Sequence, residues 1–367
     1  MLADVRAVAD LDPLAVAKGH VGSQRDPAPD ARFASGRDMG VVPVMHESEQ
    51  MEEGPRVEQR PESSEETGHS GSQTVLAVVV PFLNEIEYLP TLLQSIEGQS
   101  RQPDQLVLVD DGSTDGSYEL AQAFAAQYPY VLALRRPPRP PERDRLARAA
   151  ELQAFQWGLQ QVAVPYDIVA KLDADLDLNP VHFAAIETLF DQDPGLGIAG
   201  AYLSVRLPDG STARERHPLE HVRGPTKFYR RACLDQIGPL PTHLGWDTID
   251  DVRARMHGWR TASVELTGGD SIHLRPTGLH DGRLRAYCRW GECAYGFGSH
   301  PLAVLAAALL RARQRPYLLG GAAYVLGWAR ASVRRRPRAD AATRAFRRRE
   351  ELKRIRRVAA SPPRHAA

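Results

Sequence analysis

Six apolar residues lead directly into a polar loop in the run Val75-Leu-Ala-Val-Val-Val-Pro-Phe-Leu-Asn-Glu85. A continuous apolar run of this length is typical of a strand that is buried on both faces of a parallel sheet. Pro81 is expected to end the strand, because it has no backbone N–H to donate to a neighbouring strand. From Tyr88 to Gly98 apolar residues recur at helical spacing, which predicts a helix after the strand.

The same alternation of strand and helix continues along the chain. Buried strands are expected at residues 106–109, 131–134, 167–172, 197–205 and 261–266. Helices are expected at residues 117–128, 146–162, 183–190, 228–237 and 248–257. Because parallel strands need crossover connections, this alternation predicts an α/β fold with a mostly parallel central sheet flanked by helices.

Composition excludes several classes of protein and sets both ends of the chain apart. The 367 residues are 43% hydrophobic and 25% charged, which is ordinary for a soluble globular protein. Three cysteines are too few for a disulfide framework. Residues 1–73 hold fourteen acids and seven bases with few large apolar side chains, so we expect a disordered acidic tail. We expect residues 74–298 to form the globular α/β domain and residues 299–367 a helical basic extension.

The C-terminal extension has apolar stretches at residues 302–310 and 317–329, followed by fourteen Lys or Arg against three acids in residues 330–367. Two interpretations are open: helices packed on the core, or a pair of helices lying at the surface of an anionic membrane. A solvated basic helix is a simpler alternative. Nucleic-acid binding is the weakest, because few aromatic side chains are available to stack on bases, and we expect no nucleic-acid partner.

Neither a membrane-spanning segment nor a secretion signal is predicted. No apolar run reaches the roughly 18 residues of a spanning helix, and the N-terminal residues show no apolar core of a signal peptide. We therefore expect a cytoplasmic protein, peripheral at most on the inner face of the plasma membrane.

Polar motifs follow three of the predicted strands. They are Pro81-Phe-Leu-Asn-Glu85, Asp110-Asp-Gly-Ser-Thr-Asp115 and Asp173-Ala-Asp175. The carboxyl ends of parallel strands form the edge at which ligands bind in open α/β sheets. The two carboxylates of Asp-x-Asp can share one Mg²⁺ or Mn²⁺, which would neutralise a diphosphate leaving group. One such acid could merely cap a helix, but capping does not explain three acidic strand ends together.

In residues, order and spacing, these three motifs closely resemble the family 2 glycosyltransferases of the GT-A fold, over roughly residues 74–265. Members transfer a sugar from a nucleotide-diphosphate donor with inversion, use Mg²⁺ or Mn²⁺, and have a Rossmann-like sheet. The resemblance implies a donor-binding set of Pro81, Asn84, Glu85, Asp110, Asp111, Ser113 and Asp173, in which Asp110 and Asp111 hold the base and ribose. It implies metal ligands at Asp173 and Asp175. Asp177 is a weaker candidate, because in an extended chain a residue two positions on points to the same side.

The resemblance also implies a position for the catalytic base. An inverting transfer needs a general base for the acceptor hydroxyl. In the family an acidic pair at the start of a helix usually supplies it, eleven residues before a Gly-aromatic pair, and Gly258-Trp259 points in this way to Asp247. Trp246 replaces the usual Glu, so Asp250 is a second candidate and Asp251 a third. All three acids could instead only favour the helix dipole.

Further polar groups follow the last predicted strand of the domain. His273 and Arg275 could reach the metal or the diphosphate, and His273 is counted among the candidate metal ligands. Arg289-Trp290 matches the end of a Gln-x-x-Arg-Trp motif found in processive members, but Ala286 stands at the Gln position. Because spanning segments are also missing from the sequence, single addition is favoured over polymerisation.

The sequence therefore predicts a metal-dependent inverting glycosyltransferase. We expect a UDP- or GDP-sugar donor and a hydroxyl acceptor on a glycan or lipid-linked molecule, in cell-envelope or exopolysaccharide synthesis. One alternative is a nucleotidyltransferase of similar fold, although the Gly- and Lys/Arg-rich loop usual after its first strand is missing here. Another is a non-catalytic binding protein, although the metal and base carboxylates are present. Short motifs do not reveal the sugar or the acceptor.

Overall fold

A seven-stranded sheet forms the centre of the structure, a computed structural model that describes residues 74–139, 144–207, 210–215, 217–275, 282–314 and 316–360. The acidic tail expected at residues 1–73 lies outside the described residues. From one edge the strands are β10 (Arg260–Val264), β6 (Leu196–Ala201), β9 (Thr226–Arg230), β4 (Ile168–Leu172), β1 (Leu76–Phe82), β2 (Gln105–Asp110) and β3 (Val131–Arg135). Only β9 runs antiparallel to its neighbours in this sheet. The predicted, mostly parallel central sheet is confirmed.

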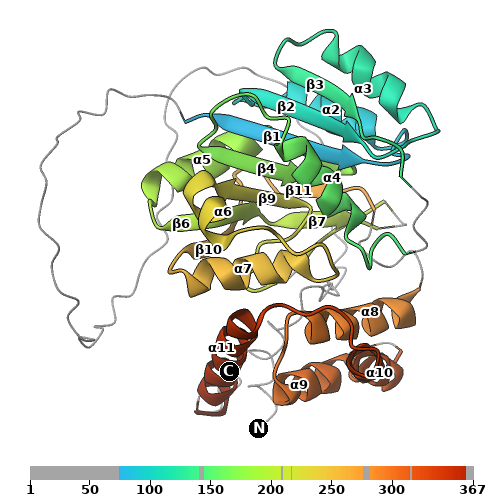
Figure 1. Cartoon of the computed structure of the whole chain (residues 1–367), viewed down its shortest axis with the longest axis vertical. Helices are drawn as coiled ribbons and strands as arrows, with labels where there is room; N and C mark the ends of the chain where they lie inside the picture. The colour runs from blue at the N-terminus through green and yellow to red at the C-terminus, as the bar shows by residue number, and fades with distance from the viewer. Residues whose placement is uncertain are drawn as a thin grey trace, which may run out of the picture. The chain divides into compact units, whose positions relative to one another are not determined.

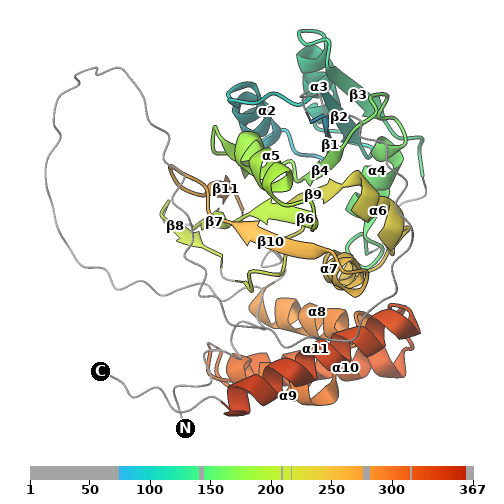
Figure 2. The same ribbon diagram turned by 90° about the vertical axis from the view of Figure 1, so that its left-hand side faces the viewer.

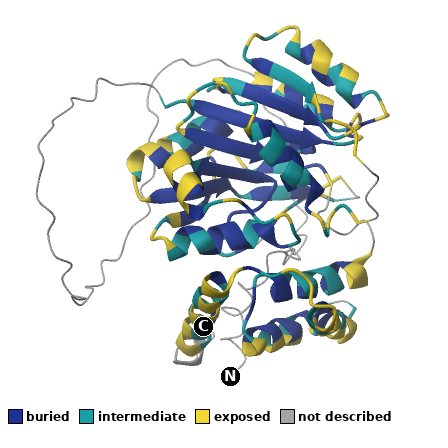
Figure 3. Cartoon of the chain, viewed as in Figure 1, coloured by how far each residue is buried: buried dark blue, intermediate teal, exposed yellow. Residues whose placement is uncertain are grey.

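Helices cover both faces of this sheet, and β1 supplies side chains to both of the resulting cores. Val78 and Val80 pack in a core with α2 (Leu89–Glu97), α3 (Ser117–Ala125) and α5 (His182–Gln192). Ala77 and Val79 pack in a second core with α4 (Ala150–Leu159), α6 (Arg231–Ile237) and α7 (Trp246–Met256). In Figure 2, α2 and α5 lie on one side of the central strands and α4 and α6 on the other. Burial on both faces explains why β1 is apolar throughout (Figure 3).

Three predicted elements differ from the structure. Strand β1 continues through Pro81, which pairs only with Val109 of β2, because the pairing of β1 with β4 has already ended at Val79. Residues 226–230 form β9 rather than the start of the helix predicted at 228–237, since pairing with β4 and β6 outweighs the local helical pattern. The strand predicted at 197–205 is divided into β6 and β7 (Leu203–Arg206), which belong to different sheets.

A second, four-stranded sheet brings a distant segment to the end of β4. Its order is β5 (Leu176–Asp177), β11 (Ser271–His273), β7 and β8 (Thr212–Arg214). Strand β5 follows the Asp-x-Asp motif directly, and it pairs with β11 so that His273 stands opposite Leu176. This pairing places His273 beside the acidic end of β4, although about a hundred residues separate them in sequence.

Four helices follow the sheets: α8 (Arg283–Gly296), α9 (Pro301–Arg311), α10 (Leu319–Val333) and α11 (Ala341–Ala360) (Figure 1). Helices α8 and α10 touch through glycines, since a Cβ on Gly291 would lie 1.9 Å from the Tyr324 carbonyl oxygen. Helix α11 contacts α7 through the ion pair of Arg255 and Glu350 at 2.8 Å. Helix α8 shares an apolar core with α9 and α10. The domain boundary expected at residue 298 stays a prediction.

Within the described part of the chain, no helix combines the length and the apolar character that crossing a bilayer requires.

Candidate active site

A cavity of about 820 Å³ opens at the carboxyl ends of β1 and β4. It collects residues from all three polar motifs and from α7 and α8. The predicted site residues that line it are Pro81, Glu85, Asp111, Asp173, Asp175, Asp247, Asp251, His273 and Arg275. This volume is in the range of small-molecule sites. The structure thus brings together most of the residues that the sequence singled out.

Three predicted donor-site residues, Asn84, Asp110 and Ser113, form hydrogen bonds in the neighbouring loops and do not line the cavity. The buried carboxylate of Asp110 accepts hydrogen bonds from the Ser113 backbone N–H at 2.8 Å and from Arg135 Nε at 2.6 Å. The Asn84 side-chain oxygen accepts from the Thr114 N–H at 2.9 Å, and the Asn84 N–H donates to Ser113 Oγ at 2.9 Å. Asn84 itself has a positive φ of 54°, which Asn tolerates better than most residues. These contacts join the loops after β1 and β2.

Asp111 lies in the cavity wall and is surrounded by arginines that sequence analysis did not connect with it. Arg136 Nη1 lies 2.6 Å from its carboxylate, and Arg139 and Arg145 also form ion pairs with it. All three come from the Pro/Arg-rich segment after β3. The loop therefore supplies positive charge beside the predicted nucleotide pocket.

The predicted metal ligands form one cluster. Ligand atoms of Asp173, Asp175 and His273 all lie within 4.8 Å of one another, with Asp175 and His273 buried. His273 Nε2 is 3.2 Å from Asp175 Oδ1. Burial lowers the pKa of His273, but its contact with Asp175 outweighs this and raises the pKa overall. Two carboxylates and an imidazole suit a divalent cation such as Mn²⁺ or Mg²⁺. Asp177 is not part of this cluster.

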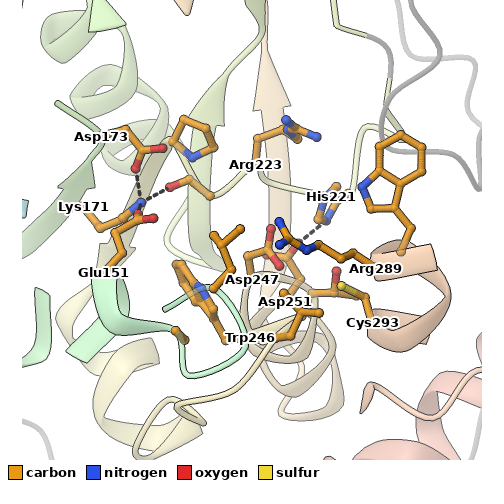
Figure 4. A pocket seen from close by; sticks show the side chains of 18 of the residues that line it. Glu151, Lys171, Asp173, His221, Arg223, Trp246, Asp247, Asp251, Arg289 and Cys293 are labelled. Carbon is orange, nitrogen blue, oxygen red and sulfur yellow. Dashed lines mark hydrogen bonds and ion pairs between the residues drawn. The ribbon is translucent and has the colours of Figure 1, made fainter. Parts of the chain in front are cut away.

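A buried lysine holds Asp173 in place. Lys171 is 1% exposed, forms ion pairs with Asp173 and with Glu151 of α4, and donates to the Gly224 carbonyl oxygen at 3.0 Å (Figure 4). No sequence motif predicted this role. Its only signal was a charged residue inside an otherwise apolar strand, which is rarely fully buried without a partner.

Arg275 links the motif after β1 to the metal cluster. Its Nε donates to Asp175 at 2.6 Å, and its guanidinium also pairs with Glu85. Burial raises the pKa of Glu85 to about 7 even though Arg275 opposes the shift. Glu85 is thus a partly desolvated carboxyl group near the predicted diphosphate site.

Helix α7 presents Asp247 to the cavity from its first turn. Gly245 precedes the helix with a φ of 86°, a conformation in which glycine is favoured. Within the described residues, the Asp247 carboxylate has no hydrogen-bond or ion-pair partner. Trp246 lines the cavity and also packs in the core, and the Lys171 and Lys227 ammonium groups each lie 5.7 Å from its ring. Of the three candidate bases, Asp247 has a carboxylate left free for an acceptor.

Asp250 and Asp251 are buried between α7 and the sheet, although Asp251 also lines the cavity. Asp250 is 0% exposed and does not line the cavity, and its carboxylate accepts from Lys227 Nζ and Tyr229 Oη, both at 2.6 Å. Asp251 lies 3.0 Å from Lys227 Nζ and accepts from His221 Nδ1 at 2.8 Å. Burial raises the pKa of Asp251, but Lys227 and His221 outweigh it and hold the pKa below its usual value. Of Asp247 and Asp250, only Asp247 therefore lines the cavity.

Replacing Lys227 with Met is expected to lower the free energy of unfolding by about 3–5 kcal/mol, because two buried carboxylates would lose their shared cation. Urea unfolding of the full chain, followed by circular dichroism, measures this. The control is Arg231→Ala, which removes an exposed ion pair with Asp235 and should cost at most about 1 kcal/mol. Equal unfolding midpoints for the two variants would contradict the structural role of Lys227.

Arginine and histidine side chains line the part of the cavity formed by α8 and by the segment before β9. Arg223 is buried, and its Nη2 lies 3.0 Å from Glu215 Oε2. His221 Nδ1 contacts the Asp251 carboxylate at 2.8 Å. Arg289 enters from α8, beside Cys293 (Figure 4). The incomplete Arg-Trp motif therefore does contribute to the cavity. Sequence analysis missed His221 and Arg223, which no motif marked.

Comparison with known proteins now decides the family. A profile described as glycosyl transferase family 2 matches residues 77–244. An undecaprenyl-phosphate mannosyltransferase from Micrococcus luteus is 37% identical over 203 residues, which span 55% of this chain and 72% of that protein. This chain belongs to the family 2 glycosyltransferases.

Other relatives of this glycosyltransferase match over smaller parts or at lower identity. A polyprenol monophosphomannose synthase from Mycolicibacterium smegmatis is 32% identical over 130 residues, 34% of this chain and 44% of that protein. A mannosyltransferase from Pyrobaculum calidifontis, solved with GDP-Man and Mn²⁺, has 19% identity and a TM-score of 0.48 over 80% of this chain and 82% of that one. The expected family and the GT-A fold are confirmed. The nucleotidyltransferase and non-catalytic alternatives find no support among these relatives.

Proposed function

We propose that this glycosyltransferase is a metal-dependent inverting enzyme that moves a sugar from a UDP- or GDP-sugar to a hydroxyl of a glycan or lipid-linked acceptor. The observation that carries the proposal is the cavity itself. It joins the Asp173–Asp175–His273 cluster to Asp247, whose carboxylate has no partner among the residues that the structure describes. A donor site and a base that open into one cavity are what an inverting transfer requires.

The residues divide the work as follows. Asp173, Asp175 and His273 would hold the cation, which when bound supplies charge neutralisation for the departing diphosphate. Lys171 would position Asp173 through their ion pair. Arg275, which pairs with Glu85 in this structure, would bind diphosphate oxygens instead when the donor is present. Asp247 would accept the proton of the acceptor hydroxyl. Pro81, Glu85 and Asp111 would line the nucleotide side, whereas Asn84, Asp110 and Ser113 hold the loops around it.

The acceptor proposal draws on the relatives. One is named as an undecaprenyl-phosphate mannosyltransferase and another as a polyprenol monophosphomannose synthase, so lipid substrates occur among them. We propose that this enzyme also uses a lipid-linked acceptor in cell-envelope or exopolysaccharide synthesis. It would then work from the cytoplasm at the inner face of the plasma membrane, adding single sugars.

A thermal-shift screen of nucleotide sugars tests the donor and metal assignments together. One UDP- or GDP-sugar is expected to stabilise the protein with Mn²⁺ and to lose this effect with EDTA. A ligand at about 100-fold above its Kd adds about 2.7 kcal/mol to the free energy of unfolding. Slow metal-dependent release of the nucleoside diphosphate should accompany binding. Stabilisation that persists in EDTA would contradict metal dependence, and stabilisation by a nucleoside triphosphate alone would contradict the transfer of a sugar.

A further inference from the structure

Helix α9 has an apolar outer face that no described residue covers. Leu302, Leu305 and Leu309 follow one another at single-turn spacing and are 54%, 54% and 58% exposed. The opposite face, which includes Val304 and Ala308, is buried against the neighbouring helices. A helix of a water-soluble domain normally turns polar residues outward. Here both faces of α9 are apolar.

Helix α10 continues the exposed apolar surface. Leu318, directly before α10, is 74% exposed, and Leu326 and Val333 within it are 63% and 84% exposed. The two helices are in close contact, since a Cβ on Gly321 of α10 would lie 2.4 Å from the Ala308 carbonyl oxygen of α9. We call the exposed apolar side of this helical hairpin the leucine face: Leu302, Leu305, Leu309, Leu318, Leu319, Leu326 and Val333. Exposed apolar side chains occur singly on most proteins, but a set of this size marks an interaction site.

Exposed arginines stand at both ends of the leucine face. Arg313 follows α9 at one end, and Arg334, Arg335 and Arg336 follow α10 at the other. Among the described residues between 301 and 357, Asp340 is the sole exposed acid, and it pairs with Arg253. The partner of this surface must therefore be apolar at its centre and negatively charged around it.

We propose that the leucine face docks on a bilayer of anionic lipids, with the hairpin lying along the surface and the arginines among the headgroup phosphates. Apolar side chains flanked by arginine are the signature of helices that lie at a membrane interface. A second copy of this chain fits the surface less well, because a twofold contact through the leucine face would bring the arginine groups of the two copies together.

The hairpin that docks also forms part of the active-site cavity. Arg311 of α9 and Tyr324 of α10 line the cavity from the inner side of the hairpin. Docking would thus hold the cavity over the membrane with one layer of helices, about 10 Å thick, between it and the lipid. The reactive end of a lipid-linked acceptor would have to reach the cavity past this layer. This consequence for the acceptor rests on the proposed function, whereas the docking itself does not.

Vesicle flotation of the full chain tests the docking. The wild type is expected to float with vesicles of equal parts phosphatidylglycerol and phosphatidylcholine, and to stay unbound with phosphatidylcholine alone. Leu305→Glu should weaken the partitioning by about tenfold or more, since a leucine that would enter the lipid is replaced by a charge. Replacing Arg334, Arg335 and Arg336 together with Ala should weaken it by about 100-fold.

The matched control is Leu219→Glu, which places the same charge at a leucine that is 67% exposed but outside the hairpin. It should float like the wild type. The proposal would be overturned if the wild type did not bind anionic vesicles, or if the Leu305→Glu variant floated with them as well as the wild type does. So would a dimer in analytical ultracentrifugation that Leu305→Glu dissociates, without any vesicle binding. Flotation needs no turnover, so an error in the proposed function would leave this result unchanged.

Discussion

Replacing Asp175 with Asn is expected to reduce sugar transfer by about 10³-fold or more while the protein stays folded. Asp175 is 4% exposed and contributes a carboxylate to the cluster with Asp173 and His273. Asn has nearly the same shape but no charge, so the cluster would hold a divalent cation far more weakly. Asn can still accept a hydrogen bond from Arg275 Nε, and Arg275 keeps its ion pair with Glu85, so the protein should remain folded. The initial rate of nucleoside diphosphate release with saturating Mn²⁺ measures the effect.

Asp177→Asn is the matched control for this variant. Asp177 lies two residues further on, carries the same charge and is outside the cluster. Its replacement should leave turnover within about twofold of the wild type, as for most substitutions away from a site. Near-normal turnover of Asp175→Asn would contradict the metal assignment, and so would an Asp177→Asn variant that is equally inactive. Titrating Mn²⁺ by thermal shift separates loss of metal binding from loss of fold.

The acidic strand ends could be predicted from sequence because each motif follows an apolar run directly. Asp111, Asp173 and Asp175 needed only the rule that parallel strands end at one edge. His273 could be proposed from its place after the last strand of the domain, and the structure brings it to Asp175 through the pairing of β11 with β5. Two members of the cluster are therefore neighbours in sequence, and one long-range strand pairing adds the third.

The sequence ranked Asp247 above Asp250 only through its position in the family pattern. The two residues are three apart on one helix, so helical geometry places them on neighbouring positions of the same side. What separates them is Lys227 and Tyr229, which bury Asp250 and leave Asp247 in the cavity. Both partners come from β9, the strand that local pattern predicted as part of a helix. Its pairing with β4 and β6 is non-local, and a local pattern does not report it.

The arginines of the site were hidden for a different reason. Arg136 and Arg145 lie in a loop whose Pro-rich sequence excludes regular structure but does not say where its side chains go. Arg289 enters the cavity because α8 is fixed by α10, through backbone contacts at Gly291 and Gly327. Such contacts require glycine, because a side chain would not fit. A glycine adds nothing to an apolar periodic pattern, so the pattern does not reveal the contact.

Replacing Asp247 with Asn is expected to reduce transfer to a hydroxyl acceptor by about 10²–10⁴-fold, the usual contribution of a general base. Asn fits the same space at the start of α7 but takes no proton. Donor binding should be unchanged, because the metal cluster and the loops after β1 and β2 stay as they are. Initial rates with acceptor, together with the Kd of the donor in Mn²⁺, separate the two effects. Asp235→Asn is the matched control, since Asp235 is an exposed acid of α6 away from the cavity.

The same variant distinguishes two kinds of acceptor oxygen. A hydroxyl must lose its proton as the bond to the sugar forms, so it needs Asp247. A phosphate monoester is already ionised at neutral pH and can attack without a base. Comparing Asp247→Asn with a glycan acceptor and with a polyprenyl phosphate therefore reports which chemistry the cavity serves. A large loss confined to the glycan identifies Asp247 as the base for a hydroxyl. A variant that transfers to both acceptors at the wild-type rate would show that Asp247, although it faces the cavity, takes no proton in the reaction.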